Sequence, residues 1–108
     1  MKTLKPHQLL IALSLFLVSC STTTYLGDAY PATTKTDFYY DAKDVKQDYK
    51  VIGHLTTPYS DNSNYVKEAL SKKGTAIGAD GIIILEAVGH DENKVVKADA
   101  IKYTVKDN

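Results

Sequence analysis

The chain contains a single cysteine, Cys20, and this count constrains its fold more than any other feature. One thiol cannot form an intramolecular disulfide, and it cannot supply a cysteine-rich metal site. Small domains often depend on such cross-links because their hydrophobic cores are small. The folded part of this 108-residue chain must therefore be held together by its apolar core alone.

Residues 1–19 have the parts of a secretory signal peptide. Lys2 and Lys5 form a positive start, and residues 9–18 form a mostly apolar run. An apolar run of about ten residues spans only about half of the ~30 Å hydrocarbon core of a bilayer. The run is therefore too short for a permanent transmembrane helix.

The sequence Leu17-Val18-Ser19-Cys20 resembles the lipobox of bacterial lipoproteins. In that motif the thiol receives diacylglycerol, the signal peptidase cuts before the cysteine, and the new amine is acylated. The resemblance implies that Cys20 becomes an N-acyl, S-diacylglycerol cysteine, so that covalent lipid holds the protein on a membrane. In such lipoproteins an aspartate at the position of Ser21 would favour the inner membrane. This chain has Ser21 there, which favours attachment of the protein to the outer membrane, with the folded domain facing the periplasm.

Charge and composition argue against a nucleic-acid partner. Removal of Lys2 and Lys5 with the signal leaves 11 lysines against 13 acidic residues, a net charge of about −2. The chain has no arginine, the residue most used for bidentate contacts with phosphate and guanine. We therefore expect no binding to nucleic acid.

Residues 20–35, which begin the mature chain, are rich in Thr and Ser and have no sustained periodicity, which is typical of a tether. Tyr25, Leu26 and Tyr30 have no use in a pure spacer. Part of this stretch could therefore lie against the domain as an edge segment. We expect the folded domain to span residues 36–108.

Two short strands are predicted at the start of this domain. Residues 37–41 alternate, with Phe38 and Tyr40 on the buried face and Tyr39 on the exposed one. Residues 49–57 also alternate. Gly53 lies inside this second strand and indicates a bulge or a close backbone approach.

One helix and two further strands complete the pattern. Apolar residues from 66 to 77 recur at helical spacing, with an N-cap among residues 61–64 and with Gly78 as the residue after the C-cap. The continuous apolar run 82–85 predicts a central strand buried on both faces. In residues 95–105 the apolar phase slips, which indicates a bulge near residues 98–100.

The order of these elements is ββαββ. It predicts an α+β fold, in which one helix packs on one face of a four-stranded, largely antiparallel sheet.

A family resemblance rests on two segments of the sequence. They are Ala-Ile-Gly-Ala-Asp-Gly-Ile-Ile at 76–83 and Ala-Asp-Ala-Ile at 98–101. They are similar to the helix–Gly-Ala-Asp–strand segment of RcsF-like and YbjQ-like small domains, and the latter have been described as heavy-metal-binding. The chain also resembles small bacterial lipoproteins with a Tyr-x-Val-Ile-Gly strand, here Tyr49 to Gly53. The resemblance implies a fold and a cell-envelope setting rather than an activity.

His54 and His90 are the candidate metal ligands. The segment His90-Asp91-Glu92 offers one nitrogen and two carboxylates, but its spacing matches no zinc pattern and is typical of a solvated turn. His54 could join His90 only if the fold brings two strand ends together. A small ligand- or metal-binding envelope lipoprotein is therefore the alternative function, and no cofactor is predicted.

Tyrosines offer the best candidate contact surface. The chain has eight tyrosines, and Tyr39 together with Tyr25, Tyr30 and Tyr59 could contact a protein partner or peptidoglycan. No Ser, Thr or Cys lies in a nucleophile elbow, and no glycine-rich loop precedes the helix. We therefore expect an envelope protein that works through contacts and not through catalysis.

Overall fold

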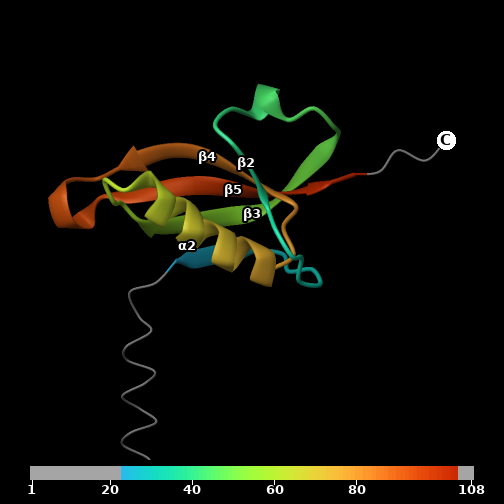
Figure 1. Ribbon diagram of the computed structural model, residues 1–108, viewed down its shortest axis with the longest axis horizontal. Helices are drawn as coiled ribbons and strands as arrows, with labels where there is room; N and C mark the ends of the chain where they lie inside the picture. The colour runs from blue at the N-terminus through green and yellow to red at the C-terminus, as the bar shows by residue number, and fades with distance from the viewer. Residues whose placement is uncertain (1–22, 105–108) are drawn as a thin grey trace, which may run out of the picture.

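The computed structural model describes residues 23–104, so Cys20 and the predicted signal peptide lie outside the described part. Figure 1 shows a twisted sheet with one helix across one face. The elements are β1 (Thr24–Gly27), β2 (Asp37–Tyr39), the 3-10 helix η2 (Ala42–Asp44), β3 (Tyr49–Pro58), α2 (Ser63–Ala76), β4 (Gly81–Val88), the 3-10 helix η3 (Asp91–Asn93) and β5 (Val95–Tyr103).

The sheet has five strands in the order β1-β3-β5-β4-β2. β3 pairs with both β1 and β5 in antiparallel fashion, and β5 pairs with β4 in the same way. β4 pairs with β2 in parallel. The predicted α+β class with one helix is confirmed. The predicted four-stranded, largely antiparallel sheet is wrong in detail, because β1 adds a fifth strand at one edge and β2 lies parallel at the other.

β1 belongs to the stretch that was predicted to be a tether. It pairs with β3 along its whole length. Beyond it, the Tyr30 amide donates to the Ile77 carbonyl at 2.8 Å, and the Thr33 amide donates to the Thr75 carbonyl at 2.9 Å. The folded domain therefore begins before the predicted boundary at residue 36. The segment Thr-Tyr-Leu-Gly has two adjacent apolar residues and no apolar–polar alternation, so the sequence does not indicate a strand there.

The two bulges lie in the neighbours of β5. One residue is inserted in β3 between Val51 and Gly53, and one is inserted in β4 between Ile84 and Glu86. The predicted bulge in β5 near residues 98–100 is therefore wrong. The change in the apolar alternation of residues 95–105 arises instead because β5 has buried residues on both faces of the sheet.

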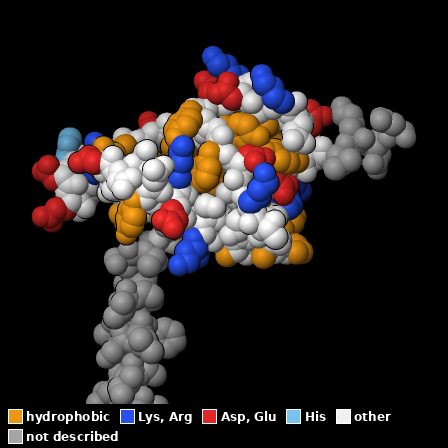
Figure 2. All heavy atoms as spheres, in the orientation of Figure 1, with side chains coloured by type: hydrophobic (Ala, Val, Ile, Leu, Met, Phe, Trp, Pro, Cys, Tyr) orange, Lys and Arg blue, Asp and Glu red, His pale blue; other side chains and the backbone are white. Residues whose placement is uncertain are grey.

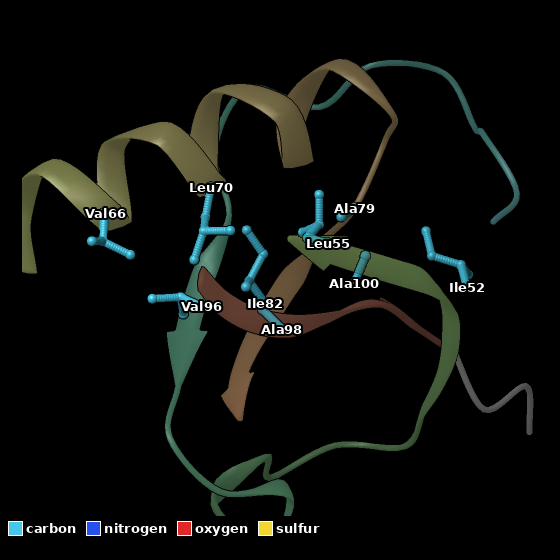
Figure 3. Packing of buried hydrophobic residues seen from close by; sticks show 9 residues of the cluster. All are labelled: Ile52, Leu55, Val66, Leu70, Ala79, Ile82, Val96, Ala98 and Ala100. Atoms are coloured by element: carbon cyan, nitrogen blue, oxygen red, sulfur yellow. The ribbon is translucent and has the colours of Figure 1, made fainter. Parts of the chain in front are cut away.

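The larger buried layer lies between the sheet and α2. Figure 3 shows these side chains pointing into the space below the helix. On the opposite face, Ile83 and Ile101 are 2% and 0% exposed; Ile83 is paired with Tyr39, and Ile101 with Gly81. The main cluster consists of Ile52, Leu55, Val66, Leu70, Ala79, Ile82, Val96, Ala98 and Ala100.

The prediction that the run 82–85 is buried on both faces holds only for its first half. Ile82 and Ile83 are buried, whereas Leu85 is 53% exposed. Leu85 is the inserted residue of the β4 bulge, and β2 pairs with β4 only as far as Ile83. Beyond Ile83, β4 is therefore an edge of the sheet.

Both ends of α2 are set by local sequence, as predicted. The Asn62 side chain accepts hydrogen bonds from amides of the first turn. At the other end Gly78 has a φ of 85°, and the Ala79 amide donates to the Gly74 carbonyl at 2.9 Å. This is a Schellman motif, which favours glycine at its left-handed position.

Asp80 connects the end of this helix to the end of β5. The Tyr103 amide donates to Asp80 Oδ2 at 2.9 Å, and Lys102 Nζ lies 3.3 Å from Asp80 Oδ1. Lys102 Nζ also donates to the Gly78 carbonyl at 2.8 Å. The Gly-Ala-Asp segment thus ends the helix and holds the last strand with one carboxylate.

Candidate functional site

Two of the predicted contact tyrosines serve the packing of the domain. The Tyr25 hydroxyl donates to the carbonyl oxygens of Ile52, at 3.2 Å, and Asp28, and a Cβ atom on Gly53 would lie 2.4 Å from that hydroxyl. This confirms the predicted close approach at Gly53. Tyr30 is half-buried, and its ring is approached by the ammonium groups of two lysines. Both rings are therefore held by the domain itself.

Tyr39 does not have the predicted exposure. It is half-buried, and its hydroxyl lies 2.6 Å from that of Tyr103, which in turn donates to Asp37 Oδ2 at 2.6 Å. Tyr40 is instead the exposed ring, with 61% of its surface accessible. β2 ends at Tyr39, so Tyr40 no longer follows the alternation of the strand that predicted its burial.

Tyr40 and Tyr59 line a small pocket beside the first turn of α2. Its volume is about 190 Å³, and it also contains Val66, Ile84 and Val96. Figure 3 shows Val66 and Val96 at the same end of the core. The polar residues of the pocket are Ser60, Asp61, Ser63 and Lys67.

A lysine ammonium group lies near each of the two tyrosine rings of this pocket. Lys67 Nζ lies 5.4 Å from the centroid of the Tyr40 ring, and Lys94 Nζ lies 4.2 Å from that of Tyr59. A hydrogen bond to Asp61 and the negative charge of that carboxylate raise the pKa of Tyr59 above its ordinary value. The Tyr59 hydroxyl is thus a donor to Asp61, and both residues line the pocket.

The size and lining of the pocket limit what it can accept. Pockets for drug-sized ligands have volumes of about 300–1,000 Å³, so this one fits a single side chain or one small ring. Tyrosine walls offer apolar contact with little loss of side-chain entropy, and they are enriched among the residues that dominate binding energies. Asp61 and Lys67 add one acceptor and one donor that can orient the inserted group.

Of these residues, sequence reasoning singled out only Tyr59 as a contact. Asp61 was considered solely as a helix cap, and Tyr40 was assigned to the buried face. Tyr59, Ser60, Asp61 and Ser63 are close together in the sequence, but Tyr40, Ile84 and Val96 reach the pocket from distant segments, so the sequence carries no signal for it.

The two candidate metal ligands are not brought together. His54 Nδ1 lies 2.8 Å from Asp99 Oδ1 on the face of the sheet opposite α2, and the His54 side chain is 68% exposed. His90 lies in the β4–β5 turn, beyond Val95. Asp99 and Val95 are four residue steps apart along β5, which is a distance of about 13 Å. Within residues 23–104, no group of three or more His, Cys, Asp or Glu side chains could hold a metal ion.

In the part of the chain that the structure describes, no helix is long and apolar enough to cross a membrane. Comparison with protein-family models, with curated proteins and with solved structures finds no match to this chain.

Proposed function

We propose that this chain is a lipid-anchored envelope protein whose folded domain works through contacts with a protein or with peptidoglycan. Cys20 is the lipidated residue, and the pocket between Tyr40 and Tyr59 is the contact site. The single observation that carries the contact role is this pocket, in which two exposed tyrosines flank an apolar floor next to one acidic and one basic group.

The anchor rests on the signal-like segment that ends at Cys20. Burial of an acyl chain stabilises membrane binding by about 0.8 kcal/mol per CH₂ group. Three chains of about fifteen carbons each therefore give tens of kcal/mol, which is enough for lasting attachment. Ser21 in place of aspartate supports an outer-membrane location.

Replacement of Cys20 tests the anchor. Cys20→Ala should abolish labelling by radioactive fatty acid and should leave an uncut precursor or a soluble product. If the variant incorporates fatty acid as well as the native chain does, Cys20 is not the lipidated residue.

Site-specific photo-crosslinking in living cells tests the contact site. A benzophenone amino acid at position 40 or 59 should capture the same discrete species. The same probe at Val51, which is 47% exposed on the opposite face of the sheet, is the matched control and should not capture it. Release of the species by a muramidase would identify it as peptidoglycan rather than protein.

A second variant makes the crosslinking specific for the pocket. Asp61→Asn and Lys67→Gln each remove one polar group of the pocket and should weaken capture from position 40. Equal capture from Val51, or capture from position 40 that neither substitution changes, would contradict the proposed site.

A further inference from the structure

A larger hollow lies on the other side of α2. It is a groove of about 820 Å³ between the helix and the sheet edge formed by Thr23 and the end of β3. Its helix side includes Tyr65, Ala69 and Ala76. Nothing described so far gives this groove a role.

The groove opens next to the place where the folded domain meets its proposed anchor. Thr23 lines it, and the Thr23 hydroxyl lies 2.8 Å from the Thr57 hydroxyl, which fixes the start of the described chain against β3. Cys20 precedes Thr23 by three residues. Three residues span at most about 11 Å, so this edge of the domain lies close to any membrane that holds the lipid of Cys20.

The side chains around this edge have the chemistry of a membrane interface. Tyr65, on the helix side of the groove, is 65% exposed. Tyrosine is enriched at the head-group level of bilayers because it combines an apolar ring with a polar tip. In Figure 2 hydrophobic and basic side chains lie along the lower edge of the molecule, with an acidic side chain between them.

The charge of the groove differs in sign from that of the whole mature chain. Lys72 and Lys73 line it against a single acid, Glu68, whereas the mature chain has a net charge of about −2. Lysines near a surface of anionic lipid are attracted to it over roughly one Debye length, about 8 Å at physiological salt. The lysines therefore favour one orientation of an otherwise acidic domain.

We propose that the β1–α2 edge, including this groove, is the membrane-facing surface of the domain and lies on an anionic phospholipid bilayer. Tyr65 enters the head-group layer, and Lys72 and Lys73 pair with lipid phosphates. This inference rests on the proposed anchor at Cys20. It leaves the Tyr40–Tyr59 pocket, on the other side of α2, open to a partner.

The lipidated full-length protein, reconstituted in vesicles, provides the test. Lipid occupies the only native thiol, so an introduced cysteine can be labelled alone with an environment-sensitive fluorophore. Ala76→Cys places the label in the groove. Ala42→Cys is the matched control, because Ala42 is also exposed and lies in η2, on the far side of the sheet from α2 (Figure 1).

Quenching by a nitroxide-bearing lipid should be several-fold stronger for the label at residue 76 than for the label at residue 42. The paired substitutions Lys72→Gln and Lys73→Gln should reduce the quenching at residue 76 in vesicles containing phosphatidylglycerol. The pair Lys43→Gln and Lys46→Gln is the control of equal charge and should change nothing.

Equal quenching at residues 76 and 42 would overturn the inference, and so would quenching at residue 76 that the Lys72 and Lys73 substitutions leave unchanged. Vesicle flotation of each labelled protein separates this result from failure of the anchor. Protein that floats with equal quenching refutes the orientation alone. Protein that does not float with vesicles refutes the anchor and the orientation together.

Discussion

Replacement of Asp80 by alanine should reduce the stability of the domain more than the loss of any exposed charge. The Asp80 carboxylate accepts hydrogen bonds from the Tyr103 amide at 2.9 Å and from Lys102 Nζ at 3.3 Å. A hydrogen bond to a charged group contributes about 1.5–3 kcal/mol. The side chains of Asp80 and Lys102 are 26% and 23% exposed, so solvent screens part of this contribution. We expect a total loss of about 2–3 kcal/mol.

Urea unfolding of the purified lipoprotein in detergent, followed by circular dichroism, measures this loss. For a domain of this size each kcal/mol lowers the Tm by about 4–8 °C, so Asp80→Ala should lower it by roughly 10–20 °C. Asp80→Asn retains one acceptor for the Tyr103 amide but loses the charge, and its stability should be intermediate. The slope of the free energy of unfolding against urea concentration should stay unchanged, because unfolding exposes the same surface in the variant and in the native protein.

Asp44→Ala is the matched control, because it removes an exposed acid from η2 and should change the stability by less than about 0.5 kcal/mol. If Asp80→Ala is no more destabilising than Asp44→Ala, the carboxylate does not hold β5 to the end of the helix. The structural explanation of the Gly-Ala-Asp segment would then be refuted.

Three further substitutions test the core and the half-buried hydrogen bonds among Tyr39, Tyr103 and Asp37. Leu70 is 0% exposed, so Leu70→Ala should cost about 2–5 kcal/mol in the same urea assay, and a loss below ~1 kcal/mol would mean that α2 is not packed as described. Gly53→Ala should cost about 1–3 kcal/mol, because the new methyl group would meet the Tyr25 hydroxyl, and this cost should shrink in a Tyr25→Ala background. Burial and the hydrogen bond to Asp37 raise the pKa of Tyr103 well above its ordinary value. The stabilisation that protonated Tyr103 contributes is therefore fully present below about pH 10 and is lost as the pH rises further. The Tyr103→Phe variant should lose less stability than the native protein at alkaline pH. An identical alkaline loss in both proteins would contradict this assignment.

Much of the secondary structure was predictable because local chemistry determines it. Asn62 and Gly78 end α2 through hydrogen bonds within a few residues, and such caps can be read directly from the sequence. The strands that begin at Asp37 and Tyr49 were recognised from period-two alternation, and the strand that begins at Val95 was recognised despite a slip in its alternation. The α+β class follows from the order of these elements.

The candidate site was predictable only in part. Tyr59 was proposed as a contact residue and is 41% exposed, whereas Tyr39 and Tyr40 have the reverse of their expected exposures. Alternation predicts which face of a strand a residue lies on, but it does not predict where the strand ends. Because β2 ends at Tyr39, the next ring turns outward and becomes a wall of the pocket.

The sequence by itself determined the helix with its two caps, most of the strands and the proposed lipid anchor, since each depends on residues close together in the chain. Only the tertiary structure decided that Thr24–Gly27 forms an edge strand, that β2 and β4 are parallel, and that the bulges lie on both sides of β5. It alone brought Thr23 beside α2 and Tyr40 beside Tyr59. These features depend on pairings between distant segments, whose free energy arises from packing and hydrogen bonding in the assembled sheet and leaves no periodic trace in any one of them.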